Sequence, residues 1–174
     1  MRYALVYGGF AGAIVIGVLV AGLAFDLHSH ATSEWFGYLV MLVAMSLIFV
    51  GVKRYRDVEC GGVIRFGRAF GLGLGISAVA ALIYVLGWEA YLAASGIDFM
   101  AQYSAIVADG MRADGAPPAA IEAKMAEMRR MAQMYRNPLF RIPITFVEIF
   151  PVGLIVALVS AALLRNPKLL PAAR

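Results

Sequence analysis

Residues 69–91 read AFGLGLGISAVAALIYVLGWEAY, and this stretch decides the fold class. Glu89, close to its end, is the one charged side chain in it. The hydrocarbon core of a bilayer is about 30 Å thick, and a helix needs about 20 apolar residues to cross it. A backbone in lipid must satisfy its own hydrogen bonds, which favours a helix. The stretch therefore predicts a membrane-spanning helix.

Three further stretches have the same character: residues 4–25, 35–52 and 142–164. They carry no charged side chain apart from Glu148 in the last of them. Over the whole chain 62% of residues are hydrophobic and 15% are charged, against a charged share of roughly a quarter in soluble domains. We therefore predict an all-α fold, a bundle of four transmembrane helices, with residues 1–174 forming a single membrane domain. This composition excludes a disordered chain.

Basic residues predict the orientation of the four spans. Residues 53–68 hold Lys53, Arg54, Arg56, Arg65 and Arg68, whereas residues 26–34 hold no Lys or Arg. Cytoplasmic loops carry an excess of such residues, so we expect both termini and residues 53–68 in the cytoplasm. The same bias explains the net charge of +4 without a nucleic-acid partner, and the expected partner is the lipid bilayer.

Small residues spaced four apart let membrane helices approach closely. Three of the predicted spans carry such rows: Gly9, Ala13, Gly17 and Ala21 in the first; Gly67, Gly71 and Gly75, beside Gly73, Ser77 and Ala81, in the third; Gly153, Ala157 and Ala161 in the fourth. The rows fit packing within the chain, and they equally fit a homodimer or contact with another membrane protein.

Residues 92–141, between the third and fourth spans, are more polar. Apolar residues recur at three- and four-residue steps from Phe99 to Met111, and again within residues 118–136, which is typical of amphipathic helices. Residues 114–118 read DGAPP and interrupt the pattern. We predict an extracytoplasmic amphipathic helical hairpin that lies on the membrane surface or over the bundle.

A methionine series in the second of these helices raises the question of a metal site. The series comprises Met125, Met128, Met131 and Met134, and His28 and His30 are expected on the same side of the membrane. Clustered thioethers select Cu(I). However, three-residue steps spread the four side chains over about half of the helix circumference, and methionine commonly fills adaptable apolar surfaces. We predict packing, with no metal and no cofactor.

Glu148 is the most informative polar residue, because it lies within the fourth predicted span. A charge at that depth costs about 3 kcal/mol or more unless it is neutralised, paired or hydrated. No Lys or Arg lies at that depth in any predicted span, whereas Tyr84 and Tyr38 do. Glu89 lies close to the rim, where Arg141 can reach it. We predict a buried polar cluster of Glu148, Tyr84, Trp88, Glu89 and Tyr38. Such a cluster is either structural or a place where Glu148 exchanges a proton or binds a ligand.

Several short motifs occur in a recognisable order: Tyr55-Arg56-Asp57, Gly61-Gly62, Phe66-Gly67-Arg68-Ala69-Phe70, Gly87-Trp88-Glu89 with Tyr91, Asp98-Phe99-Met100, Asn137-Pro138-Leu139-Phe140-Arg141 and Glu148-Ile149-Phe150-Pro151-Val152-Gly153. Together they resemble the family catalogued as domain of unknown function 4199, small bacterial membrane proteins with about four spans. The resemblance implies a location in the bacterial cytoplasmic (inner) membrane. It implies no activity and no catalytic residue.

Three classes of function are compatible with these features. The favoured one is a non-catalytic scaffold, assembly factor or regulatory partner in the membrane. The alternative is a small transporter or an ion or proton pathway that uses Glu148. A membrane-embedded enzyme is the least favoured, because its site would have to use Glu89, Glu148, His28 or His30, which show no catalytic spacing.

Overall fold

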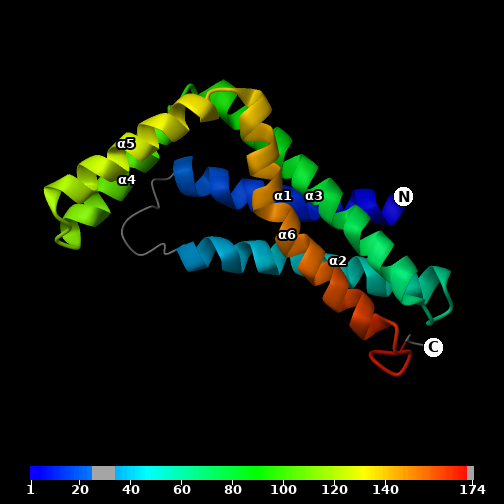
Figure 1. Ribbon diagram of the computed structural model, residues 1–174. Coiled ribbons are helices and arrows are strands. Elements are labelled where there is room, and N and C mark those ends of the chain that lie inside the picture. Colours follow the sequence, from blue (N-terminus) through cyan, green and yellow to red (C-terminus); the bar gives the residue numbers. More distant parts are fainter. Residues whose placement is uncertain (25–33, 172–174) are drawn as a thin grey trace. The chain divides into compact units, whose positions relative to one another are not determined.

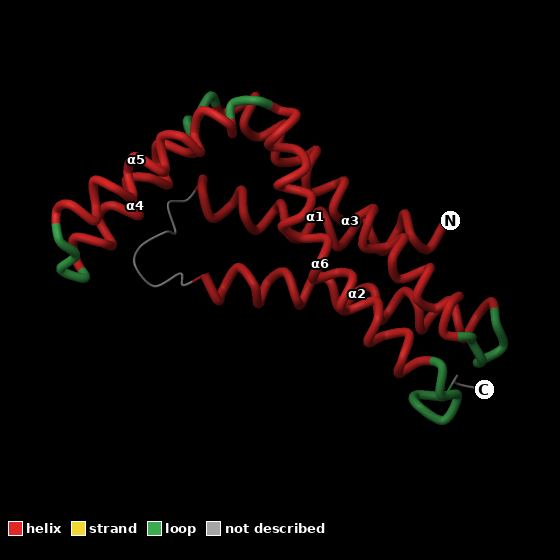
Figure 2. The backbone as a smooth tube through the Cα atoms, viewed as in Figure 1, coloured by secondary structure: helices red, strands yellow, loops and turns green. Residues whose placement is uncertain are grey.

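A computed structural model describes residues 1–24 and 34–171 (Figure 1). Their regular elements are all helices: α1 (Arg2–Ala24), α2 (Glu34–Glu59), α3 (Phe66–Ser95), α4 (Phe99–Ala113), α5 (Pro118–Tyr135) and α6 (Pro138–Leu164). The described segments between them are short turns and loops (Figure 2). The predicted all-α class is confirmed for these residues.

Four of the helices, α1, α2, α3 and α6, are long and apolar enough to cross a membrane. They correspond to the four predicted spans but are longer. The clearest case is α2, which was predicted to end at residue 52 and continues to Glu59. Hydropathy locates the apolar part of a helix and not its end, and the Lys53–Asp57 ion pair one turn apart supports the added turns.

The chain divides into two compact units. The bundle unit comprises the described residues of Met1–Trp88 and Phe146–Arg174, and the insert unit comprises Glu89–Thr145. The helices α3 and α6 contribute residues to both units. The prediction that residues 1–174 form a single membrane domain stays a prediction.

Small residues bring α3 and α6 together in the bundle unit. A Cβ atom added at Gly73 would lie 2.8 Å from the Cβ of Ala157, which is too close for two real side chains. One added at Gly153 would overlap the hydroxyl of Ser77. The rows that begin at Gly73 and Gly153 are therefore confirmed as packing surfaces.

The helix α1 packs through different glycines from the predicted row. A Cβ atom at Gly12 would lie 2.5 Å from the backbone oxygen of Ala80 on α3, and Gly8 is equally tight. By contrast, Gly17 is exposed and opens onto free space. The predicted row on α1, which includes Gly9 and Gly17, therefore does not pack against other helices of the bundle unit, and that interpretation of the row is wrong. The helix carries small residues on two faces, and the shape of α3 selects one of them.

The centre of the bundle unit is closely packed and apolar. Met45, Ile48, Ile76 and Ile149 are completely inaccessible, and they come from α2, α3 and α6. In water, each completely buried CH₂ group would contribute about 0.8 kcal/mol to stability. Lipid tails are as apolar as this core, so in a membrane close packing between the helices provides the stabilisation instead.

The insert unit contains α4 and α5, which lie side by side (Figure 1). Phe99 at the start of α4 contacts Tyr135 at the end of α5, with ring centroids 6.1 Å apart. Turn residues that include Gly115, with φ of 72°, connect the two helices. The predicted bounds of both helices agree with the structure to within a few residues.

Candidate functional site

Glu148 lies in the bundle unit beside Tyr84, as predicted. Tyr84 is 4% exposed, and its hydroxyl donates to Oε2 of Glu148 over 3.4 Å. Hydroxyl–carboxylate hydrogen bonds are normally shorter than 3.0 Å, so this one is weak. Trp88, one helical turn after Tyr84, is also buried, at 3% exposure.

Glu148 does not lie in the core as predicted: the residue as a whole is exposed on the surface of the unit, and its hydrogen bond from Tyr84 is partly buried. The neighbouring Ile149 points into the core, and one residue along a helix is a rotation of about 100°. Tyr38 is not part of a buried cluster either, since it is 60% exposed, and the next buried residue after it on α2 is Met41.

Glu89 belongs to a separate ion pair in the insert unit. The guanidinium of Arg141 donates from Nε to Oε1 of Glu89 over 2.6 Å and from Nη2 to Oε2 over 2.5 Å. Its Nη1 donates to the backbone oxygen of Tyr135 over 3.2 Å. The predicted proximity of Glu89 and Arg141 is confirmed. Two parallel hydrogen bonds between planar groups make this a bidentate charge pair.

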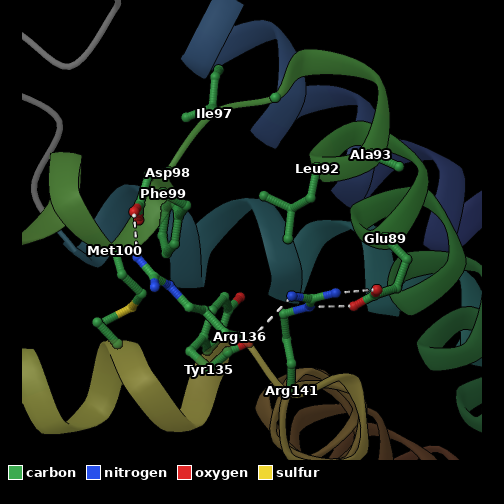
Figure 3. Close-up of a pocket in the computed structure, with 12 residues that line it drawn as sticks. Glu89, Leu92, Ala93, Ile97, Asp98, Phe99, Met100, Tyr135, Arg136 and Arg141 are labelled. Atoms are coloured by element: carbon green, nitrogen blue, oxygen red, sulfur yellow. Dashed lines mark hydrogen bonds and ion pairs between the residues drawn. The ribbon is translucent and has the colours of Figure 1, made fainter.

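The Arg141–Glu89 pair forms part of the wall of a cavity of about 390 Å³ within the insert unit (Figure 3). A second charge pair, Arg136 and Asp98, lies on another part of the wall with 3.6 Å between Nη2 and Oδ2. The remaining lining is mostly apolar and aromatic: Leu92, Ala93, Gly96, Ile97, Phe99, Met100, Ala132 and Tyr135.

Local sequence explains how Asp98 is placed on this wall. Gly96, directly after α3, has a φ of 62°, a backbone conformation that glycine adopts at no steric cost. Asp98 is then the N-cap of α4, and its Oδ1 accepts from the backbone N–H of Ala101 over 3.0 Å. The cap fixes one carboxylate oxygen and leaves Oδ2 directed at Arg136.

The methionine series is spread over α5, as its spacing predicts. Met128 is 7% exposed, whereas Met131 and Met134 are 37% and 45% exposed. Within residues 1–24 and 34–171, His, Cys, Asp and Glu side chains form no group of three that could hold a metal ion. His28 and His30 lie outside the described residues.

Comparison with known proteins gives one match. The family model described as "Protein of unknown function (DUF4199)" matches residues 2–166, nearly the whole chain. The chain belongs to this family. No curated protein and no solved structure matches it.

The basic pattern of residues 53–68 predicts that Arg56 is a loop charge, whereas the structure of this DUF4199 chain places it on the buried side of α2. Arg56 is completely inaccessible. It donates to Oδ1 of Asp57 over 2.7 Å and to the backbone oxygens of Leu169 and Leu170 over 2.9 Å and 2.5 Å. Its position four residues after the buried Val52 was the available signal, because residues four apart share a helix face.

The Arg141–Glu89 pair of this DUF4199 chain should contribute measurable stability. In a double-mutant cycle with Glu89→Gln and Arg141→Gln, we expect a coupling energy of about 1 kcal/mol, because the pair is bidentate and only 15% and 24% exposed. The exposed Lys124–Glu127 pair is the control, and its coupling should be about 0.3 kcal/mol. Detergent unfolding followed by circular dichroism measures both. Equal couplings would contradict this prediction.

Proposed function

We propose that this chain is a non-catalytic subunit of a membrane assembly, acting as a scaffold, assembly factor or regulatory partner. The observation that carries the proposal is Glu148, an ionisable residue exposed on the surface of α6, which is long and apolar enough to cross a membrane. A charged group at that depth costs about 3 kcal/mol or more in lipid. Within the described residues its polar contact is the weak hydrogen bond from Tyr84, which does not offset that cost.

The surroundings of Glu148 support an interface with another protein. The same outward side of α6 carries the exposed residues Pro151, Ile155, Leu158, Val159 and Ala162. These residues are apolar, so lipid tails or another apolar helix suit them equally. The carboxyl group distinguishes the two surroundings, because a partner helix can offer it a hydrogen-bond donor and lipid tails cannot.

Photo-crosslinking in native membranes tests this proposal. We expect a photoreactive residue at Ile155, which is 62% exposed, to give a discrete protein adduct. The yield should fall several-fold in Glu148→Ala, since the buried polar contact would be lost. The matched control is a photoreactive residue at Leu82 on α3, 53% exposed, whose crosslinks should not respond to Glu148→Ala. Lipid adducts alone at position 155 would contradict the proposal.

A proton pathway is the second candidate, favoured by the contact between the Tyr84 hydroxyl and Glu148. Both groups exchange protons, and intramembrane carboxylates mark proton relays in many transporters. Proton flux into proteoliposomes separates the two functions. If the assembly proposal holds, Glu148→Gln and the unmodified protein give equal flux, whereas a pathway through Glu148 loses its flux in the variant.

The proposed location is the bacterial cytoplasmic membrane, with both termini inside and the hairpin of α4 and α5 outside. The basic residues of segment 53–68 support this orientation. Reporter fusions at residues 60, 120 and 174 should give cytoplasmic, extracytoplasmic and cytoplasmic signals. A cytoplasmic signal at residue 120 would overturn the arrangement.

A further inference from the structure

The cavity of the insert unit is lined by two acidic and two basic side chains: Glu89, Asp98, Arg136 and Arg141. Their formal charges cancel. A purely anionic ligand would meet as many repulsive groups as attractive ones, and a purely cationic ligand would as well. The complementary ligand is one that carries a negative and a positive group on one small frame.

The Arg141–Glu89 pair is not available to a ligand, because its groups already bind each other. Arg141 directs two donors at Glu89 and a third at the backbone oxygen of Tyr135. Both side chains are mostly buried, at 15% and 24% exposure. Breaking this pair would leave a poorly hydrated charge unpaired, which is costly. The Arg141–Glu89 pair therefore holds the shape of the cavity.

The other pair, which joins Arg136 to Asp98 (Figure 3), can give up its ion pair to bind a ligand. Arg136 and Asp98 are 79% and 56% exposed, and 3.6 Å separates Nη2 from Oδ2. Exposed pairs of this length contribute little stability. The guanidinium of Arg136 can turn to a phosphate group in a bidentate arrangement, and the Oδ2 of Asp98 can then accept from an ammonium group. One long ion pair is replaced by two short ones.

The rest of the wall suits the same ligand. The rings of Phe99 and Tyr135, 6.1 Å apart, add aromatic surface to the wall, and the guanidinium of Arg141 lies over the Tyr135 ring. Leu92, Ile97 and Met100 provide an apolar surface for a glycerol backbone. The volume of about 390 Å³ is at the lower end of the range for small-molecule sites, so it fits a headgroup and not a whole lipid.

The insert unit also contains the ends of two helices that are long and apolar enough to cross a membrane. Residues 89–95 of α3 and residues 138–145 of α6 belong to it, and the former contribute Glu89, Leu92 and Ala93 to the cavity. The ends of spans lie at the level of lipid headgroups. We propose that this cavity binds the headgroup of a zwitterionic phospholipid, with phosphate on Arg136 and ammonium on Asp98. The proposal does not depend on the function proposed for Glu148.

Native mass spectrometry of the full chain in detergent tests it. The protein is equilibrated with phosphatidylethanolamine and phosphatidylglycerol of identical acyl chains at equal concentration, and retained lipid is counted. We expect the zwitterionic lipid to be retained about five-fold more. Glycerophosphoethanolamine, added as a soluble competitor, should displace it only at much higher concentration, because a lipid is also held by its acyl chains.

Two variants and two matched controls locate the site. Arg136→Gln and Asp98→Asn should each abolish the preference, and Asn keeps the N-cap of α4 because it is an equally good capping residue. Arg130→Gln and Asp109→Asn make the same charge changes at exposed positions outside the cavity and should leave the preference intact. Circular dichroism checks that all four variants fold. Equal retention of the two lipids, a preference for phosphatidylglycerol, or a preference that survives Arg136→Gln and Asp98→Asn would overturn the proposal.

Discussion

Replacement of Arg56 by methionine should lower the free energy of unfolding by about 3–5 kcal/mol. Arg56 is completely buried, and it holds three oxygen atoms: one of Asp57 and the backbone oxygens of Leu169 and Leu170. Methionine fills a similar volume without any donor. The two backbone oxygens then lose charge-assisted hydrogen bonds, and the segment after α6 loses its attachment to α2.

The measurement is unfolding in mixed detergent micelles, together with limited proteolysis of the segment after Leu164. Arg56→Met should unfold at lower denaturant and be cleaved faster in that segment. Arg54→Met is the matched control, because Arg54 is an exposed arginine on the same helix, and its effect should stay within about 0.5 kcal/mol. Equal behaviour of the two variants would show that the buried contacts of Arg56 do not stabilise the bundle unit.

The second large effect is expected from Gly12→Leu on α1. Even the first side-chain carbon would lie 2.5 Å from the backbone oxygen of Ala80 and 2.8 Å from the Cβ of Ile83. A backbone oxygen cannot rotate away as a flexible side chain does, so α1 must separate from α3. We expect a loss of about 3 kcal/mol, at the upper end for overpacked contacts.

Gly17→Leu provides the comparison on the same helix, since a side chain there meets open space. It makes the identical chemical change and should alter stability by no more than about 0.5 kcal/mol. A cysteine pair at Ala4 and Gly75, where the two Cβ atoms would lie 3.5 Å apart, reports the separation directly, because its crosslinking should be lost in Gly12→Leu and kept in Gly17→Leu. A larger loss in Gly17→Leu would mean that α1 packs through its other face.

The four spans could be predicted because a long apolar helix is dictated by the bilayer and not by its neighbours. Residues 69–91 needed no tertiary information to be assigned. The helices of the insert were equally accessible, since DGAPP at residues 114–118 and Asn137-Pro138 mark where α4 and α5 end. The proximity of Glu89 and Arg141 followed from their positions near the ends of adjoining spans.

What could not be predicted is which face of each helix turns inward. Glu148 and Ile149 are neighbours in the sequence, yet one is exposed and the other is inaccessible. On α1, Gly8 with Gly12 and Gly9 with Gly17 are both rows of small residues, and only the first contacts α3. In a membrane both faces of a helix are apolar, so the contrast between polar and apolar sides that orients helices in water is missing.

The cavity of the insert unit could not be predicted from the sequence either. Its wall combines residues near 89–100 with residues near 132–141, and the pairing of Arg136 with Asp98 depends on how α4 lies against α5. Amphipathic patterns identify both helices but do not set their register.

The attachment of Arg56 to Leu169 and Leu170 has a consequence for biosynthesis. These partners lie 113 and 114 residues later in the chain, so a ribosome that has delivered α2 to the membrane has yet to translate them. At the usual translation rate of about 5–20 residues per second, several seconds or more pass between the synthesis of Arg56 and that of its backbone hydrogen-bond acceptors. During that interval the end of α2 has to stay in contact with water or with an insertion factor. Translation arrest before residue 169 would leave the guanidinium of Arg56 without these two acceptors.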